Sequence, residues 1–400
     1  MLPCPEVSRQ TMPTIVLRHV SKRFGPQDLS DLGRIAVPAA RIFDADRTHS
    51  ADRRQATQEP PDRNLALDDL SLTIRNGETL SVLGPSGCGK TTLLKVIAGL
   101  LKPDSGEITY DGVPIQAIPV AERGIGMVFQ TYALYPHMET RENIGFYDIV
   151  RHQPEKIPER IRHIVEVMGI EVTHLLSRKP PTLSGGEQQR VAVARCLARE
   201  PKLFLFDEPL SNLDAKLRVD TRIQLNRLLR YYQITSVYVT HDQTEAIALA
   251  HRIAIMRAGK IEQIGTAHAL YEAPVNAFVA QFFGTPPMNL FLGHIFGNAW
   301  EGRGFQVLSI RPGLRQGQAV WLGIRPENIE LSEHGIPARV EFTELILPQQ
   351  AQLVYVTVAG QRCTIRMPLS TRAKPDNLLH LRFPPERLYF FDRDSGARIG

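Results

Sequence analysis

A glycine-rich loop in the first quarter of the chain has the composition of a phosphate-binding site. Residues 84–92 read GPSGCGKTT, which matches G-x-x-x-x-G-K-[ST], follows the apolar segment LSVL and precedes the helical pattern KTTLLKVIAGL. Such a loop turns backbone N–H groups toward phosphates, and Lys90 would neutralise the β- and γ-phosphates while Thr91 offers its hydroxyl to Mg²⁺. Cys88 is interpreted as a small residue that fits the loop; the alternative is that its closeness to a helix start lowers the pKa of its thiol. The sequence predicts a nucleotide site made by Gly84, Pro85, Ser86, Gly87, Cys88, Gly89, Lys90, Thr91 and Thr92.

Polar side chains end three other apolar segments. KLFLFDEP, residues 202–209, ends in Asp207, which we expect to hold Mg²⁺, and Glu208, which we expect to act as general base on the attacking water. His241 follows SVYVT and is placed to hydrogen-bond the γ-phosphate or to position the water. Gln130 closes IGMVFQ and is placed to reach Mg²⁺ and the water. Taken alone, the acids are also compatible with a plain surface and the histidine with a structural role.

A second helix start carries the composition of an anion site. LSGGEQQR, residues 183–190, places Ser184, Gly185 and Gly186 at the beginning of the predicted helix EQQRVAVARCLA. The N–H groups and the dipole of a helix N-terminus attract a phosphate. One nucleotide does not need two such cradles, so this segment requires an explanation beyond the loop at 84–92.

Composition limits the class of protein. A length of 400 residues leaves room for two domains, and 43% hydrophobic with 22% charged residues is typical of a soluble globular chain. No apolar run reaches the length of a membrane-spanning helix, so we expect the chain to stay in the cytoplasm. The net charge is only +5, and the lysines and arginines are interspersed with acidic residues along the chain. This distribution argues against nucleic acid as a partner. The cysteines are scattered, which argues against a disulfide framework or zinc site: Cys4, Cys88, Cys196 and Cys363.

Hydrophobic patterning predicts two domains of different class. Strand and helix patterns alternate up to about residue 284, as expected for a parallel sheet with covering helices, and about 130–181 is mainly helical. Beyond PPMNL, segments such as LVYVTVAGQRCTIRM alternate with a period of two, which favours a small antiparallel barrel or sandwich. We therefore expect an α/β domain over 12–284 and an all-β domain over 285–400.

The segment 26–64 interrupts the first domain. It is rich in Asp, Arg and Pro without sustained periodicity, which indicates a flexible insertion between two strands. The alternative is a small docking element whose apolar residues are Leu29, Leu32, Ile35, Ile42 and Phe43. The closeness of Met12 to the first strand leaves two candidate start residues, Met1 and Met12.

Six segments, in order, carry a family resemblance: GPSGCGKTT, VFQTYALYPHM, LSGGEQQR, FLFDEP, SNLD and VTHD. Over residues 14–284, apart from the insertion, the chain resembles the ATP-binding-cassette (ABC) ATPases. The resemblance implies a P-loop NTPase core with a helical subdomain, ATP and Mg²⁺ as ligands, and a homodimer in the ATP-bound state. In such a dimer Ser184, Gly185 and Gly186 of one chain meet the γ-phosphate of ATP held by the other. Asp214 of SNLD would lie at the interface, and Phe24 of SKRFG would stack on adenine.

A narrower resemblance covers nearly the whole chain. YALYPHM, HDQTEA, PPMNL, LGIRPENI and FFDRDSGARIG are similar to segments of the ATPase subunits of importers for sugars and glycerol phosphate. This resemblance implies a C-terminal β-barrel of the TOBE type, related to the OB fold, with a regulatory role. It also implies two integral-membrane permeases, an extracytoplasmic solute-binding protein and a peripheral position on the cytoplasmic face of the inner membrane. Residues 132–138 would receive permease helices, or would pack the helical subdomain, or both.

Three functional alternatives stay open at this stage. The leading hypothesis is ATP hydrolysis that drives uptake of a carbohydrate or glycerol phosphate by dimer closure. The second is an importer ATPase for polyamine, inorganic anion or iron. The third is a soluble, non-transport ABC ATPase acting in translation or DNA repair. The single cassette and the lack of a long coiled-coil pattern or basic patch argue against the third.

Overall fold

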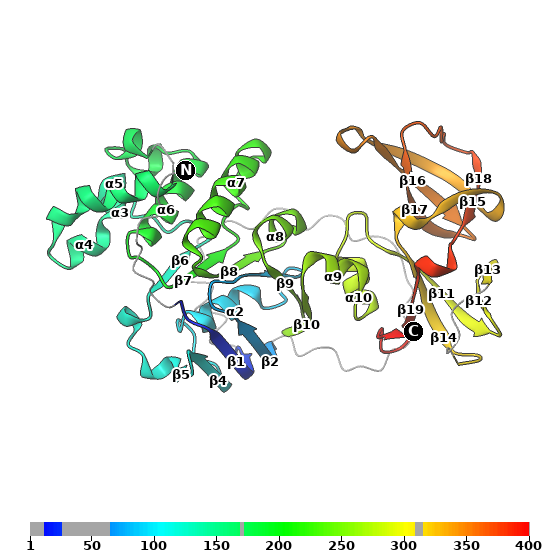
Figure 1. Ribbon diagram of the computed structural model, residues 1–400, viewed down its shortest axis with the longest axis horizontal. Helices are drawn as coiled ribbons and strands as arrows, with labels where there is room; N and C mark the ends of the chain where they lie inside the picture. The colour runs from blue at the N-terminus through cyan, green and yellow to red at the C-terminus, as the bar shows by residue number, and fades with distance from the viewer. Residues whose placement is uncertain (1–11, 26–64, 169–171, 309–314, 400) are drawn as a thin grey trace. The chain divides into compact units, whose positions relative to one another are not determined.

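The computed structural model describes residues 12–25, 65–168, 172–308 and 315–399 (Figure 1). The predicted insertion at 26–64 and the candidate start at Met1 lie outside these ranges. The chain divides into two compact units, Met1–Ile264 and Gly265–Gly400. This division lies earlier than the boundary expected near residue 285, because two short helices group with the C-terminal strands: α9 (Ala267–Glu272) and α10 (Ala277–Phe282).

The first unit contains a small antiparallel sheet of order β2-β1-β4-β5. In its central strand Ile15 pairs with Ile74 on one side and with Tyr110 on the other. The apolar residues that alternate along TIVLRHV are buried there, as expected for a strand with one face on the core. The strands are β1 (Ile15–Arg23), β2 (Leu65–Ile74), β4 (Ser105–Tyr110) and β5 (Val113–Pro114).

The central sheet of the first unit has the order β10-β9-β3-β8-β7-β6. The neighbours from β9 to β6 pair in parallel, so their carboxyl ends meet at one edge, where ligands bind in open α/β sheets. The strands are β3 (Thr79–Leu83), β6 (Ile125–Val128), β7 (Leu203–Asp207), β8 (Thr235–Thr240), β9 (Arg252–Arg257) and β10 (Lys260–Gly265).

Helices cover both faces of this sheet. Consecutive residues of β7 point to opposite faces: Leu205 packs in one buried cluster with Leu93, and Phe206 packs in another with Val191. Both faces of the strand are therefore buried, which explains its continuous apolar sequence LFLF. The helices are α2 (Lys90–Ile97), α6 (Gly185–Leu197), α7 (Ala215–Tyr232) and α8 (Gln243–Leu249).

The segment predicted to be mainly helical contains three α-helices and short 3₁₀ turns. The helices are α3 (Thr140–Ile144), α4 (Phe146–Val150) and α5 (Ile157–Met168). Arg160 of α5 donates to both carboxylate oxygens of the buried Asp148 of α4, at 2.7 and 3.2 Å. This bidentate pair joins α4 to α5, whose Ile161 and Ile164 pack in a buried apolar cluster.

The second unit is built from two antiparallel sheets, which together agree with the expected all-β domain. Their orders are β13-β12-β11-β14-β19-β20 and β17-β16-β15-β18. One apolar cluster contains Trp300 and Phe291 from the first sheet and Val354 and Ile365 from the second. The strands are β11 (Asn289–Phe296), β12 (Ala299–Gly302), β13 (Phe305–Leu308), β14 (Ala319–Ile324), β15 (Glu330–Ile346), β16 (Ala351–Val358), β17 (Gln361–Pro368), β18 (Leu378–Arg382), β19 (Leu388–Asp392) and β20 (Arg398–Ile399).

A buried arginine fastens α9 and α10 to the strands of the second unit. Arg325, at the end of β14, donates to the carbonyl oxygens of Ala280, Phe283 and Tyr271 at 2.8 to 3.0 Å. Its guanidinium also lies 3.9 Å from the ring centroid of Tyr271. These contacts explain why the compact unit begins before the expected boundary. Among the described residues, no helix is long and apolar enough to cross a membrane.

Candidate functional site

The loop between β3 and α2 depends on its glycines. A larger residue at these positions would strain or displace the backbone. Gly87 and Gly89 have φ of +78° and +105°. A Cβ atom on Gly84 would lie 2.3 Å from the carbonyl oxygen of Met256, and one on Gly89 would lie 2.2 Å from that of Ala66. The base of the loop is thus packed against neighbouring backbone, while its tip at 85–87 is exposed to solvent.

Lys90, the first residue of α2, closes the loop. Its Nζ donates to the carbonyl oxygens of Gly84 at 2.9 Å and Pro85 at 3.1 Å, and only 6% of the residue is exposed. The ammonium is therefore held within the loop at the start of a helix. Burial raises the pKa of the Cys88 thiol and outweighs the favourable charge of Lys90, which contradicts the alternative of a lowered thiol pKa.

A hydroxyl and a carboxylate link the loop to the central sheet. Thr91 Oγ1 donates to Asp207 Oδ1 at 3.0 Å, where β7 ends. Burial raises the pKa of Asp207 and the negative charge of Glu208 adds to this, while the hydrogen bond from Thr91 acts in the opposite sense. A cation bound at this carboxylate would offset that cost, and hydroxyl and carboxylate oxygens are ligands that Mg²⁺ prefers. The donor set therefore fits Mg²⁺.

The next residue, Glu208, pairs with His241. His241 Nδ1 lies 3.1 Å from Glu208 Oε2, although the two residues follow different strands. Glu208 has φ of +45°, and its backbone N–H donates to Val239 O at 3.0 Å, which turns the chain sharply after Asp207. The two adjacent acids thus point to different partners, so each has a separate chemical environment.

A buried carboxylate beneath His241 was not identified from the sequence. Glu245 Oε2 accepts from the hydroxyls of Tyr238 at 2.9 Å and Thr240 at 2.8 Å. Burial raises the pKa of Glu245, against the effect of these two donors. Thr240 also accepts from the backbone N–H of Asp242, the cap of α8, so the turn that carries His241 is held on both sides. The sequence feature that could have identified this carboxylate is the glutamate four residues after the histidine in HDQTEA.

Gln130 is joined to the segment that follows β7. Its Nε2 lies 3.5 Å from Ser211 Oγ, and its carbonyl oxygen accepts from Asn212 Nδ2 at 3.0 Å. Ser211 Oγ in turn donates to Glu208 O at 2.9 Å. The side chain of Gln130 is therefore connected to the Glu208 turn through Ser211, rather than by a direct bond to Asp207 or Thr91.

The serine–glycine segment forms a capped helix start. Ser184 Oγ accepts from the backbone N–H of Glu187 at 3.3 Å, and Glu187 Oε2 accepts from the N–H of Ser184 at 2.7 Å. The N–H of Ser184 lowers the pKa of Glu187, and Arg178 adds to this with an ion pair of 3.2 Å. The two capping bonds remain within one turn of α6, and the ion pair ties that turn to Arg178, so the helix start is fixed by contacts that do not involve the loop at 84–92.

Asp214 and Phe24 occupy well-defined local positions. Asp214 caps α7 by accepting from the N–H of Leu217 at 2.9 Å. Lys22 Nζ lies 5.9 Å from the ring centroid of Phe24, and its ion pair with Asp104 is 2.7 Å long. Phe24 is half-buried and follows the end of β1, one residue before the described range 12–25 ends.

A second contact missed from the sequence joins the segment after Gln130 to α6. Tyr132 and Ala133 both have positive φ, of 60° and 48°. Arg195 of α6 donates to the carbonyl oxygens of both, at 3.0 and 2.7 Å, and lies 5.6 Å from the ring centroid of Tyr135. One guanidinium thus holds a strained turn against the helix that begins at Ser184.

Comparisons with known proteins show what this chain is similar to. Residues 67–211 match the family model described as ABC transporter. The chain is 43% identical over 341 residues to the sn-glycerol-3-phosphate import ATP-binding protein UgpC of Salmonella typhi, with 83% of this chain and 95% of that protein covered. It is 42% identical over 341 residues to the protein of that name from Bordetella avium, with 82% and 93% covered. Against the dimeric structure of the bacterial ABC transporter cassette MJ0796, identity is 29% and the TM-score 0.49, with 63% and 98% covered.

The extent of these matches decides the family. The alignments, at 42 and 43% identity, cover more than four-fifths of this chain and more than nine-tenths of the Salmonella and Bordetella relatives. The resemblance found in the sequence is thereby confirmed, as are the P-loop α/β core and the added β domain. The chain belongs to the ABC transporter family, as an ATP-binding subunit of the importer type whose ATP hydrolysis is coupled to import.

Proposed function

We propose that this protein powers uptake of a glycerol phosphate or a related carbohydrate through two membrane permeases. An extracytoplasmic solute-binding protein delivers the solute to these permeases. The relatives named above import sn-glycerol-3-phosphate, which supports this solute class. The chain itself acts as a peripheral subunit on the cytoplasmic face of the inner membrane. The observation that carries the hydrolytic part is the sheet edge where Thr91 meets Asp207 and Glu208 meets His241.

We assign roles to the residues of that edge and to Phe24, which lies outside it. Residues 84–92 bind the triphosphate, and the Lys90 ammonium neutralises its β- and γ-oxygens. Thr91 and Asp207 would hold Mg²⁺, with Gln130 completing the set, and the ion would neutralise charge on the phosphate oxygens. Glu208 accepts the proton of the attacking water, and His241 orients the Glu208 carboxylate and donates to the γ-phosphate. Phe24 stacks on adenine.

The second half of the site comes from another copy of the chain. The start of α6 is pre-formed by its capping bonds, with Ser184 and Gly185 exposed and Gly186 buried against Leu217 of α7. In an ATP-bound homodimer this helix start meets the γ-phosphate held by the partner, and Asp214 lies at the same interface. ATP therefore joins the two chains, and hydrolysis separates them.

The helical segment transmits the movement of dimer closure to the permeases in the membrane. Arg195 joins the turn at Tyr132 and Ala133 to α6, so a displacement of α6 on ATP binding moves that turn with it. Residues 132–138 receive the permeases. We assign a regulatory role to the second unit, whose strands contribute no residue to the sheet edge, so its deletion should leave ATP-driven dimerisation intact.

Co-purification tests this proposal. The full chain, isolated from native membranes in mild detergent, should carry two polytopic permeases and a binding protein whose solute is a glycerol phosphate or carbohydrate. Recovery with permeases whose binding protein takes a polyamine, an inorganic anion or iron would overturn the solute class. Recovery in the soluble fraction with ribosomes or DNA-repair proteins would overturn the transport role and leave the ATP chemistry standing.

A further inference from the structure

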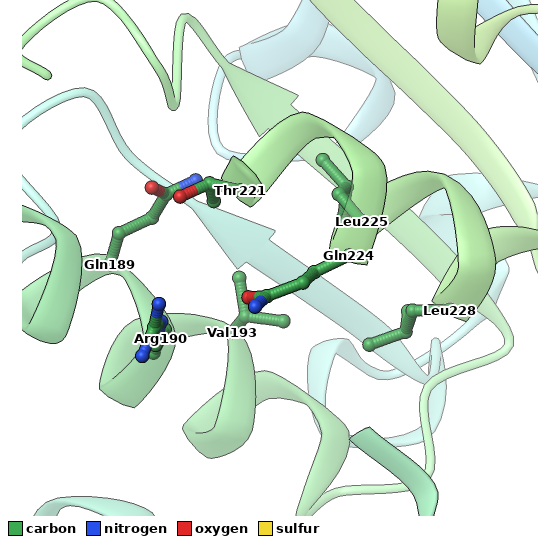
Figure 2. Close-up of a pocket in the computed structure, with 7 residues that line it drawn as sticks. All are labelled: Gln189, Arg190, Val193, Thr221, Gln224, Leu225 and Leu228. Carbon is green, nitrogen blue, oxygen red and sulfur yellow. The ribbon is translucent and has the colours of Figure 1, made fainter. Parts of the chain in front are cut away.

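A layer of polar side chains lies buried between α6 and α7. Gln189 of α6 is 1% exposed and Thr221 of α7 is 5% exposed. Neither amide atom of Gln189, nor the Thr221 hydroxyl, nor Oε1 of Gln224 has a hydrogen-bond partner among the described residues. Figure 2 shows the Gln189 side chain directed at Thr221 and the Gln224 side chain reaching toward α6. Leaving such groups unsatisfied is costly, so the layer calls for a ligand.

Apolar contacts lie on both sides of this layer. Toward the helix starts, Gly186 packs so closely on Leu217 that an added Cβ would lie 2.3 Å from Leu217 Cδ2. One turn further along each helix come Gln189 and Thr221, and after them Val193 and Leu225, which line the same cavity and belong to one buried apolar cluster. A polar layer between two apolar layers is a device that sets the register of paired helices, because sliding either helix would bury the polar groups against hydrocarbon.

The space inside the layer has the size and chemistry of a water site. The cavity measures about 20 Å³, which is enough for one water molecule. Its lining offers donors, in the Gln189 amide and Arg190 Nε, and acceptors, in the amide oxygens of Gln189 and Gln224, while the Thr221 hydroxyl serves as either. An anion would leave the acceptors unsatisfied and a cation the donors. Water alone satisfies both kinds.

We propose that this layer binds one buried water molecule that bridges Gln189 and Thr221 and thereby fixes the register of α6 against α7. The two helices begin at the serine–glycine segment and at Asp214, so the bridge holds Ser184 and Asp214 at a set spacing. The consequence for the dimer interface rests on the proposed function. The water site itself does not, because it can be tested on the chain without nucleotide.

A double-variant cycle read by hydrogen exchange tests the coupling in the full chain. Thr221→Val and Gln189→Met each remove polar atoms at nearly constant volume and leave the remaining groups short of a partner. Each should raise the opening constant of the α6 amides by about tenfold. The double variant should open about tenfold less than the product of the two, because the polar layer is then removed entirely. Additive effects would refute a shared ligand.

A matched control uses a buried hydroxyl whose partners lie in the chain. Thr235 is fully buried in β8, donates to Pro13 O at 3.0 Å and accepts from Gly77 N–H at 3.0 Å. Thr235→Val combined with Gln189→Met should act additively on α6.

A crystal structure of the full chain at high resolution separates a bridging water from a direct bond. The expected result is one ordered water within hydrogen-bond distance of the Gln189 amide and the Thr221 hydroxyl. A dry cavity with Gln189 bonded directly to Thr221 would overturn the proposal, even if the variant cycle is non-additive. A failed ATPase assay on the same preparation would instead count against the proposed function.

Discussion

Two helix starts of the first unit, those of α2 and α6, share the chemistry of anion binding but differ in how they are connected. At α2, Lys90 is almost fully buried, and Thr91 is bonded to a strand more than a hundred residues away in the sequence. At α6, Ser184 is exposed and its side chain bonds within its own turn. The first is part of a network closed inside one chain, whereas the second is a rigid surface presented outward. The comparison supports a site divided between two chains.

The largest expected effect is on hydrolysis at the sheet edge. Glu208→Gln should lower ATP turnover by about 10²- to 10⁴-fold, because the general base is lost, while the loop at 84–92 still binds ATP. Single-turnover hydrolysis and equilibrium nucleotide binding measure the two effects separately. The matched control is Glu122→Gln, at an exposed 3₁₀ turn, which should leave both unchanged. Normal turnover in Glu208→Gln would remove the assignment of the base.

A change at the other helix start should separate binding from assembly. Ser184→Arg leaves the α2 loop intact, so ATP affinity of the isolated chain should stay close to that of the wild type. ATP-driven association should weaken by about tenfold or more, because the arginine side chain fills the surface that meets the partner's phosphate. Analytical ultracentrifugation with ATP measures this. Thr182→Arg, also at an exposed residue, is the control. Loss of ATP binding by the isolated Ser184→Arg chain would contradict the comparison.

A smaller effect is expected where α6 meets the segment after Gln130. Arg195→Leu removes two charge-assisted hydrogen bonds to the carbonyls of Tyr132 and Ala133, which should cost about 1.5 kcal/mol of local stability. Hydrogen exchange at residues 131–135 measures it. Arg199→Leu removes an exposed guanidinium that lies 5.3 Å from the ring centroid of Tyr147, and should leave these amides unaffected. Equal exchange in the two variants would show that Arg195 does not hold the turn.

The smallest effect concerns the stability of the sheet edge without nucleotide. Burial raises the pKa of Asp207, so its contribution to stability is fully present below the pKa of the unfolded chain and is lost as pH rises through the folded pKa. At neutral pH the ionised carboxylate therefore costs free energy. Asp207→Asn should raise the free energy of unfolding by about 1 kcal/mol at pH 7 and lose this advantage below about pH 4. A stability difference that stays constant with pH would contradict this electrostatic origin.

The sequence predicted the elements of the first unit well, because its motifs carry local physical signals. A glycine pattern between an apolar run and a helical run specifies the turn before Lys90, and apolar strands ending in polar residues place Asp207 and His241 at one sheet edge. Contacts between distant side chains carry no such local signal. The bonds of Arg195 to Tyr132 and of Glu245 to Thr240 depend on tertiary packing, so they became visible only in the structure.

Two expectations differed from the structure for related reasons. The boundary was expected near residue 285, where the hydrophobic period changes, but the second compact unit begins at Gly265. The buried Arg325 donates to carbonyl oxygens of α9 and α10 and so joins these helices to that unit. The alternative for Cys88, a thiol pKa lowered by the helix start, is wrong, because burial has the larger effect on that pKa. In both cases a local pattern was outweighed by what the folded chain buries.

The division of the site between two chains is tested most directly by mixing two defective variants. A Lys90→Ala chain lacks its own phosphate grip but keeps the α6 start, and a Ser184→Arg chain keeps the grip but lacks that start. Neither should associate with itself on addition of ATP. The account predicts that the two differently tagged chains, mixed with ATP, form a heterodimer that each fails to form alone. A mixture that stays monomeric with ATP, under conditions where the wild-type chain dimerises, would contradict it.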